Sequence, residues 1–412
     1  MTVRWVKSYS PDLLSQRLEQ LKIIKPDNSV SFQGFEYIAN VAVLSSMVSF
    51  HDNIPNLEKR RIISDATFNA ANKGKITPQG LLEEMNELEK QYLCQRPEQY
   101  NLITTISIKR HLKLKRHSIN GNRITFRPIM NRNFNKGIEQ IKNHATYSIN
   151  GEFPRDYIFA KISVKGKSRS DAGERALDTI DLIRGIWNLF YNRGQYFRMS
   201  SGLRKPINKI VLGPLHTLHL PNGKLANELW WYEPDYRGPL DSFDPSREID
   251  NIYRFETSVR KLLKKSPFKS FLETAIIRYT RALDLTDWDN SFLRLWGLLE
   301  TLSNTGENDS HKVTVKRTSF FYKDREYVKQ ILNHLKDYRN KAVHTGSGNQ
   351  EIETYMYQLK QFVETALEFL ISNKFGFKDL NEVAQFLDLP DDRVLLNKKK
   401  HLINSALKYT RD

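Results

Sequence analysis

Three side chains that could act together on a phosphodiester lie in one short stretch of the sequence. The stretch runs from Tyr338 to Gly346 and contains Arg339, Asn340 and His344. It supplies a permanent cation, an amide and an imidazole within about one and a half helical turns. An imidazole can transfer protons near neutral pH, and a guanidinium can stabilise extra negative charge on phosphorus. These residue types therefore indicate phosphodiester chemistry that needs no metal ion.

The spacing of these residues indicates a site shared between two chains. We expect Gly346 to end the helix, which places His344 in the last turn, where unpaired carbonyl groups favour a protonated ring. At about 100° per residue, Asn340 and His344 share a face, whereas Arg339 and His344 lie about 140° apart. A groove between two copies of the helix would present Arg339 and His344 to one phosphate better than a single helix does. We therefore expect a homodimer.

The Arg-to-His spacing alone is weak evidence for a nuclease. In a basic chain with 10 histidines, this kind of spacing should occur by chance about once or twice. A second match, Arg110 and His117, lies in a segment with the pattern of a strand. Taken alone, Arg339 and His344 are better explained by a helix whose last turn carries cations that complement its dipole. The surrounding sequence shifts the interpretation toward a nuclease site.

Four amphipathic helices are predicted around the stretch. Apolar residues recur with helical period at about 267–285, 289–304, 324–345 and 350–373. A polar, basic loop is expected at 307–318, and the other connections are short. Four antiparallel amphipathic helices with such connections form a bundle.

Three motifs occur in order along these helices. They are Ala-x-x-Arg-Tyr at 275–279, Trp-x-x-Leu-Glu-x-Leu at 296–302 and, after the basic loop, Tyr-Arg-Asn-x-x-Val-His-x-Gly at 338–346. This order resembles the HEPN superfamily, and within it the Apea-like HEPN branch of prokaryotic defence proteins. The resemblance covers about residues 255–375. We recognise no family motif in the N-terminal two thirds.

The resemblance implies a metal-independent endoribonuclease whose active site forms across a two-fold helical dimer. The family motif falls on Arg339 and His344 as catalytic residues, with Asn340 at the polar position that often follows the arginine. Glu300 matches a frequently acidic position on the preceding helix. A solvated carboxylate, or an ion-pair partner for Arg339, explains Glu300 equally well. Products with a 2′,3′-cyclic phosphate and a 5′-hydroxyl are also implied.

The residues themselves allow the reaction to be argued. Without a metal cluster, the substrate has to supply the nucleophile, and the ribose 2′-OH is the group that RNA has and DNA lacks. His344 would act as general base or acid on the 2′-OH or the leaving 5′-oxygen, and Arg339 would stabilise the charge at phosphorus. Asn340 would orient the imidazole or the phosphate. We expect no metal and no cofactor.

Other kinds of site are disfavoured. Cys94 is the single cysteine, which excludes cysteine-based zinc sites and a disulfide framework and favours a reducing, cytoplasmic setting. His216 and His219 would face opposite sides of a strand, so we expect core or surface histidines there rather than metal ligands. The sequence contains no P-loop, GxGxxG, HExxH or GxSxG motif.

The charge of the chain fits a polyanionic partner, which we expect to be RNA. The 412 residues carry a net charge of +17, although a basic surface that serves solubility explains this charge too. No apolar run approaches the length of a membrane span, and the first thirty residues lack a signal-peptide core. We therefore expect no membrane partner.

The N-terminal two thirds predict mixed helices and antiparallel strands. Helices are expected at 11–24, 37–50 and 78–94, the last capped by Thr77. From Leu102 apolar and polar residues alternate, and a strand through this segment would carry Lys109, Lys113 and Lys115 on one face. These lysines could bind an RNA backbone; a strand face made soluble by lysines explains them equally well. A turn at 120–121 would lead into a strand at 123–127 and form a hairpin.

Further elements complete an α+β fold. We expect a strand at 157–164, a helix at 172–191, strands within 209–220 and an irregular connection at 230–245. The predicted organisation is a mainly helical region (1–100), an α+β sensor or substrate platform (101–250), an all-α HEPN four-helix bundle (251–375) and a helical extension (376–412) that could touch RNA or the partner subunit.

The predicted function is metal-independent RNA cleavage by a homodimer, as an antiphage defence or toxin effector. The alternative is a non-catalytic HEPN scaffold that binds RNA or a partner protein, because a fold can persist after activity is lost. The sequence does not identify an antitoxin or a trigger protein.

Overall fold

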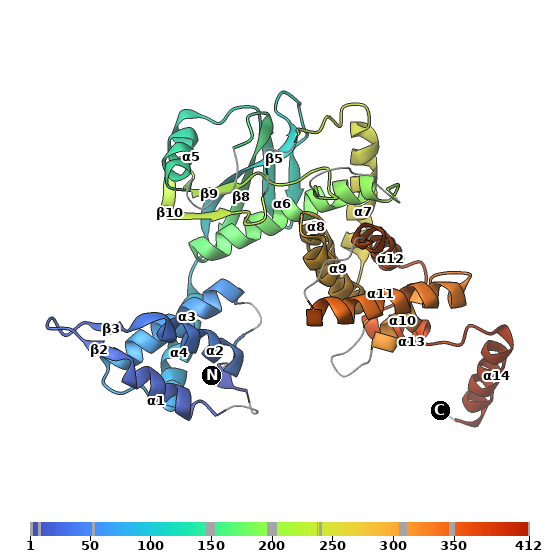
Figure 1. Cartoon of the computed structure of the whole chain (residues 1–412), viewed down its shortest axis with the longest axis horizontal. Helices are drawn as coiled ribbons and strands as arrows, with labels where there is room; N and C mark the ends of the chain where they lie inside the picture. Colours follow the sequence, from blue (N-terminus) through green and yellow to red (C-terminus); the bar gives the residue numbers. More distant parts are fainter. Residues whose placement is uncertain are drawn as a thin grey trace.

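A computed structural model describes residues 3–6, 10–51, 54–145, 153–195, 204–236, 238, 241–304, 311–345 and 351–410. At 144–145, 227–230 and 343–345 it describes the backbone alone. The chain is a mixed α/β protein with a helical C-terminal region (Figure 1). The coarse α+β prediction is thus confirmed. None of the described helices is long and apolar enough to cross a membrane.

The N-terminal region has its own hydrophobic core, built from residues between Val3 and Leu93. It contains α1 (Asp12–Gln20), α2 (Gly34–Met47), α3 (Asn56–Asn72) and α4 (Pro78–Cys94), and two small antiparallel pairs, β1 (Arg4–Trp5) with β4 (Val48–Ser49) and β2 (Lys22–Ile24) with β3 (Val30–Phe32). The predicted Thr77 cap is confirmed, because its hydroxyl accepts a hydrogen bond from the Gly80 N–H at 3.1 Å. The helix expected at 11–24 is too long, since the chain leaves α1 at Gln20 and forms β2.

A six-stranded antiparallel sheet forms the middle of the chain, in the order β10-β9-β5-β8-β7-β6. Its strands are β5 (Glu98–Lys109), β6 (His117–Ile119), β7 (Asn122–Arg127), β8 (Tyr157–Gly166), β9 (Leu215–His219) and β10 (Leu225–Tyr232). The predicted hairpin is confirmed as β6–β7. Asn120 and Gly121 at its turn have φ angles of 50° and 82°, the left-handed conformation that a two-residue hairpin turn requires.

Two predictions for the sheet are wrong. The strand expected to carry three lysines ends at Lys109, because the Leu112 N–H turns back to the Lys109 carbonyl at 3.1 Å and closes a turn. The irregular connection expected at 230–245 begins as regular structure, since Trp230 and Trp231 pair with Thr217 and His216 in β10.

Two helices cover opposite faces of the sheet. Along β5, Leu102 belongs to the core that contains α6 (Arg169–Asn192), whereas the next residue, Ile103, packs with Phe134 of α5 (Arg132–Ala145). α6 also contacts α8 (Lys269–Leu283). Gly185 permits this close approach, because a Cβ atom there would lie 2.2 Å from the Thr280 hydroxyl oxygen.

The C-terminal region is helical from α7 (Ile249–Lys265) onward. After α8 come α9 (Trp288–Leu302), α10 (His311–Ser319), α11 (Arg325–Thr345), α12 (Ile352–Ser372), α13 (Leu380–Leu387) and α14 (Arg393–Tyr409). The four helices expected around the site correspond to α8, α9, α11 and α12, with ends within a few residues of the prediction. The prediction of a basic loop at 307–318 is wrong in part, because residues 311–319 form α10.

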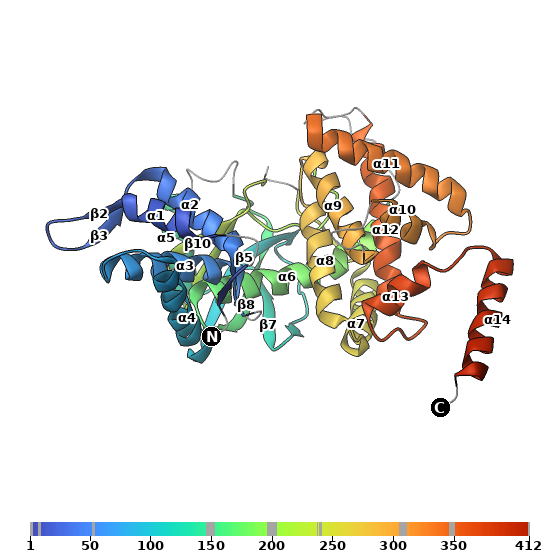
Figure 2. The same cartoon turned by 90° about the horizontal axis from the view of Figure 1, so that it is seen from below.

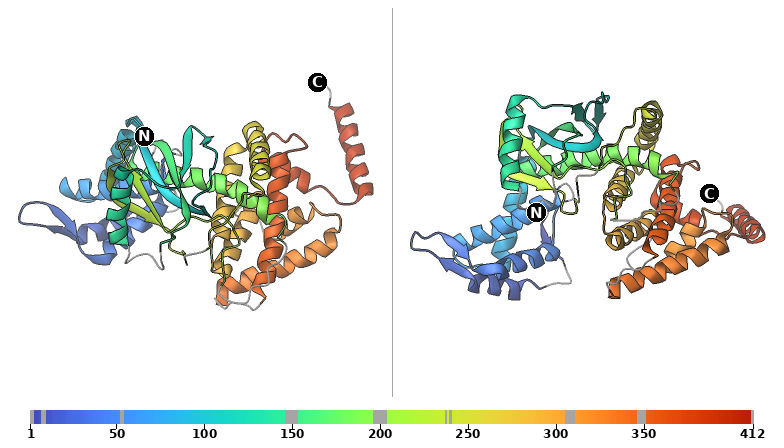
Figure 3. Two further views of the ribbon diagram at one scale, coloured as in Figure 1. Left: turned by 90° about the horizontal axis from the view of Figure 1, so that it is seen from above. Right: turned by 45° about the horizontal axis from the view of Figure 1, so that its top comes forward.

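The arrangement of these helices departs from a simple antiparallel bundle. α8, α9 and α12 lie alongside one another, and α11 runs across them (Figures 1 and 2). One core joins the sheet to these helices, since buried residues from Tyr100 to Leu387 form a single cluster. α14 stands away from this body (Figure 3) and contains no buried residue.

Candidate functional site

The predicted catalytic residues lie at the C-terminal end of α11. Arg339, Asn340 and His344 fall within its last two turns, as the sequence predicts. Asn340 and His344 are four residues apart, so their Cα atoms lie on one face of the helix, about 6 Å apart along its axis. The side chain of His344 and the predicted helix end at Gly346 fall outside what the structure describes.

Tyr338 anchors this end of α11. Its ring packs edge-on against Phe292 of α9 at 4.9 Å and lies 5.0 Å from the ring of Tyr355 of α12. Its hydroxyl donates a hydrogen bond to the Asp289 carboxylate. Burial and this carboxylate raise the pKa of Tyr338 well above its usual value, so the phenol stays protonated as a donor. The next residues, Arg339 and Asn340, are therefore carried on a fixed turn of helix.

Arg339 and Asn340 form a polar pair beside this anchor. The Arg339 Nη1 donates to the Asn340 Oδ1 at 3.4 Å, and both residues are half-buried. A guanidinium held near an amide at a partly exposed position can bind a phosphate through several donors. The structure thus brings together two of the four predicted catalytic residues by side-chain contact, and α11 places the backbone of His344 one turn further on.

Glu300 lies elsewhere. Its carboxylate accepts hydrogen bonds from the Trp296 indole N–H at 2.8 Å and from His311 Nδ1 at 2.6 Å. Glu300 follows Phe292, which touches Tyr338, by eight residues, and is therefore about 12 Å further along α9. The described residues contain no ion pair between Glu300 and Arg339, so the alternative in which Glu300 pairs with Arg339 of the same chain is not found.

His311, the first residue of α10, was missed by the sequence analysis. Its imidazole is partly exposed, with 34% of the side-chain surface accessible, and its Nδ1 lies against the Glu300 carboxylate. A carboxylate that holds one ring nitrogen fixes the tautomer of a neutral imidazole and leaves the other nitrogen as an acceptor. His311 and Glu300 therefore form an imidazole–carboxylate pair at the end of α9 far from Tyr338. Their separation of eleven residues across an expected loop gave no signal in the sequence.

The three predicted RNA-binding lysines do not share a strand face. Lys109 Nζ pairs with the Asp244 carboxylate at 3.2 Å, and hydrogen bonds from Ser246 together with Lys109 lower the pKa of Asp244 to about 2. Lys115 lies over the Tyr253 ring at 4.6 Å. Lys113 is exposed in the segment beyond β5. A role of these lysines in RNA binding stays a prediction, but it has lost its geometric basis.

The histidine pair near β9 belongs to the core. His216 bonds to the Thr104 hydroxyl at 2.7 Å and to Glu233 at 3.0 Å. His219 bonds to Thr217 at 2.8 Å and to the Gly223 carbonyl at 2.9 Å, and burial lowers its pKa. Both are therefore buried structural histidines, and of the two environments expected for them, core or surface, the structure shows the core. In the described part of the chain, no three His, Cys, Asp or Glu side chains gather in a way that could hold a metal ion.

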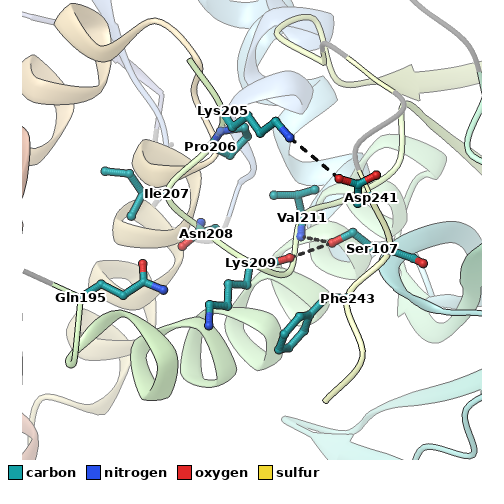
Figure 4. A pocket seen from close by; sticks show the side chains of 11 residues that line it. Ser107, Gln195, Lys205, Pro206, Ile207, Asn208, Lys209, Val211, Asp241 and Phe243 are labelled. Atoms are coloured by element: carbon teal, nitrogen blue, oxygen red, sulfur yellow. Dashed lines mark hydrogen bonds and ion pairs between the residues drawn. The ribbon is translucent and has the colours of Figure 1, made fainter. Parts of the chain in front are cut away.

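A cleft of about 470 Å³ lies where the sheet meets the helical region (Figure 4). Ser107 of β5 connects two parts of the cleft wall. The Ser107 hydroxyl donates a hydrogen bond to the Lys209 carbonyl at 3.0 Å and accepts one from the Val211 N–H at 2.9 Å. Lys205 pairs with Asp241 at 3.9 Å, and Lys209 lies over the rings of Tyr191 and Phe243 at 4.7 and 5.4 Å. The cations of this cleft are thus already engaged by the protein.

No protein-family model matches the chain, and no curated protein or solved structure is significantly similar to it.

Proposed function

We propose that the protein is a metal-independent endoribonuclease of the HEPN type that acts as a homodimer. The observation that carries the proposal is the hydrogen-bonded pair of Arg339 and Asn340 on an anchored helix whose last turn also contains His344. These groups supply charge stabilisation and proton transfer, the two functions that RNA cleavage needs when the substrate provides the nucleophile.

The proposed reaction uses the ribose next to the scissile phosphate. His344 accepts the proton of the 2′-OH, the 2′-oxygen bonds to phosphorus, and the bond from phosphorus to the 5′-oxygen breaks. Arg339 binds the phosphoryl oxygens while they carry the extra charge. A proton delivered to the leaving oxygen gives a 5′-hydroxyl and a 2′,3′-cyclic phosphate. In a two-fold dimer the second His344 can deliver that proton.

The proposed setting follows from the same resemblance. A basic chain that cleaves RNA without a cofactor suits a cytoplasmic antiphage defence or toxin effector, with the net charge of +17 supporting RNA binding.

The second candidate function is a HEPN scaffold that binds RNA or a partner protein without cleaving it. The position of Glu300 favours this alternative, because its carboxylate binds His311 and Trp296 at the other end of α9 from Tyr338. A site that had lost its acidic residue would retain the fold and the basic surface.

Cleavage of total RNA by the full-length protein in excess chelator separates the two candidates. We expect cleavage by the wild type, a loss of about 100-fold or more in rate for Arg339→Ala and for His344→Ala, and an unchanged rate for Lys336→Ala. Lys336 is the matched control, because it lies on α11 and its ammonium contacts only Asn333 and Asp337 among the described residues. Binding without cleavage by the wild type would support the scaffold instead.

A further inference from the structure

A cavity of about 990 Å³ lies between α5 and the sheet, on the face opposite α6. The edge of α5, the strands β5, β8 and β9, and the segment 153–155 line it. Protein pockets that hold nucleotide-sized ligands have volumes of roughly 300–1,000 Å³. The cavity therefore has room for one nucleotide, and none of its lining residues belongs to the proposed nuclease site.

The lining of the cavity contains three cationic side chains and one carboxylate. Arg110, Lys142 and Arg155 come from the turn after β5, from α5 and from the segment before β8, and the carboxylate is Glu139. Glu139 is 3.6 Å from Lys142 and is largely exposed, so solvent screens this pair. The net charge of the lining favours an anionic group.

Arg110 is held in place for such a role. Its backbone N–H donates to the Asp156 carbonyl at 2.9 Å, and its Nε donates to the Tyr157 carbonyl at 3.2 Å. The guanidinium carbon lies 5.5 Å from the centre of the Phe159 ring. The structure gives its two Nη groups no hydrogen bond to any described residue. A guanidinium fixed through Nε can offer its remaining N–H groups to a phosphate.

The rest of the lining is apolar or uncharged. Phe159 and Phe153 contribute rings, and Ile103 and Ile138 contribute aliphatic surface. Ile129, also in the lining, is a large apolar side chain that is 70% exposed. The uncharged polar residues Asn135, Asn143, Thr105 and Thr217 complete the wall. Apolar surface with a few uncharged polar residues suits a nucleobase.

We propose that this cavity binds a single nucleotide unit, with its phosphate near Arg110, Lys142 and Arg155 and its base against the apolar wall. Inorganic phosphate alone would not contact the aromatic rings, and a purely apolar ligand would not use the excess positive charge of the lining. The nucleotide can be free or can be the end of an RNA strand, since both present the same chemistry. The sheet would thus hold a nucleotide site separate from the proposed nuclease site.

Calorimetric titration of the full-length protein tests this inference. The probes are the four ribonucleoside 5′-monophosphates, adenosine, inorganic phosphate and a short single-stranded oligoribonucleotide with a 5′-phosphate. We expect a nucleotide to bind about tenfold or more tightly than adenosine or phosphate, with an affinity that falls as salt rises. Tighter binding of the oligonucleotide than of every monophosphate, lost in Lys142→Glu/Arg155→Glu, would identify an RNA end as the source. The reverse order would identify a free nucleotide.

Surface variants locate the binding. Lys142→Glu/Arg155→Glu should weaken nucleotide binding about tenfold or more, and Arg110→Gln should do the same. Lys136→Glu is the matched control, because Lys136 is an exposed cation of α5 outside the cavity. If Arg110→Gln fails to fold, the double variant carries the test alone.

Two outcomes would overturn the inference: no nucleotide binding by a folded wild-type protein, or equal binding by the wild type and the double variant. Arg339→Ala should bind nucleotides as the wild type does, whatever its nuclease activity. A failure of this inference is thereby distinguishable from a failure of the proposed nuclease.

Discussion

At the scale of single residues, Arg339 is the group on which the proposed chemistry depends most. Its planar fork can bind two phosphoryl oxygens at once, and its contact with Asn340 sets the direction of that fork. Arg339→Lys keeps the charge and removes the fork. We expect kcat/KM for RNA cleavage to fall roughly 10- to 100-fold in this variant, because a lysine cannot replace bidentate donors. Cleavage by Arg339→Lys at the wild-type rate would mean that only charge is needed.

Glu256 is the residue whose protonation should affect stability most clearly. This buried carboxylate of α7 receives hydrogen bonds from His117 of β6 at 2.9 Å, Trp187 of α6 at 2.9 Å and Arg260 at 3.1 Å. Burial alone would raise the pKa of Glu256, but these donors outweigh burial and lower it below its ordinary value.

Glu256→Gln is therefore expected to destabilise the protein in a pH-dependent way. The stabilisation from the ionised carboxylate is fully present above the unfolded pKa of about 4.3 and is lost as pH falls through the lower folded pKa. The variant should lose roughly 1–3 kcal/mol of unfolding free energy at neutral pH, and the difference should narrow below about pH 4. Urea denaturation at several pH values measures this. A difference in unfolding free energy that stays constant with pH would show that the pKa of the Glu256 carboxylate is not lowered in the folded protein.

The sequence could place candidate site residues that lie close together in the chain on one helix. It could not predict which distant residues folding would bring into contact. Arg339, Asn340 and His344 lie within six positions, so helical periodicity alone places them on one helix. Glu300 was grouped with them by motif order, but its partner is His311 on a helix that the sequence analysis treated as a loop. A hydrogen bond between residues on separate helices depends on how those helices cross, which no local pattern contains.

At the scale of elements, the sequence predicted some helices and missed others, among them α3, α5, α7 and α10. α4, α6, α8, α9 and α12 were all predicted within a few residues of their ends. Two of the missed helices, α3 and α10, bury hydrogen-bonded polar groups beside their apolar side chains. Glu58 of α3 accepts a hydrogen bond from Ser168 at 2.8 Å, and Arg317 of α10 donates to the Ser303 carbonyl at 3.0 Å and to Asp388 at 2.7 Å.

A buried ion pair connects α12 to the elements around it. Lys360 Nζ contacts the Glu364 carboxylate at 2.9 and 3.0 Å and donates to the Asn192 carbonyl of α6 at 2.7 Å. The Tyr279 hydroxyl of α8 also donates to Glu364. Burial lowers the pKa of Lys360 and raises that of Glu364 in spite of their pairing. The pair thus ties the sheet-covering helix to the C-terminal helices at a cost in desolvation.

Breaking this pair should cost more than replacing it. Lys360→Met leaves a buried carboxylate without its cation and should destabilise the protein by roughly 3–5 kcal/mol, whereas Lys360→Met/Glu364→Leu should recover a large part of that loss. Urea unfolding of the two variants makes the comparison. If the double variant is as unstable as the single one, the Tyr279 and Asn192 contacts matter more than the uncompensated charge.

At the scale of the whole molecule, most buried apolar residues among those the structure describes belong to two hydrophobic cores. One core holds the N-terminal helices, and the other runs without a break from the sheet into the C-terminal helices. The sequence does not reveal this continuity, because no local pattern shows that α6 packs against α8, where Gly185 lies close to Ile276 and Thr280. The charge of the chain, by contrast, is a property that composition gives directly.

The proposed shared site predicts a dimer in solution. Arg339 and His344 diverge on one α-helix, so a complete site needs two copies of the end of α11 around a two-fold axis. Light scattering during size-exclusion chromatography should give twice the mass of the 48.3 kDa chain. A strictly monomeric protein that still cleaved RNA at full rate would refute the shared site.

The chemistry of the product ends tests the central claim most directly. RNA cleaved by the full-length protein in excess chelator should end in a 2′,3′-cyclic phosphate on one side and a 5′-hydroxyl on the other. A single 2′-deoxy substitution at the scissile nucleotide should block cleavage and leave binding nearly intact, because phosphate contacts supply most of the affinity. Products that end in a 5′-phosphate, or efficient cleavage of an all-DNA strand, would show that water is the nucleophile and would contradict the roles assigned to Arg339 and His344.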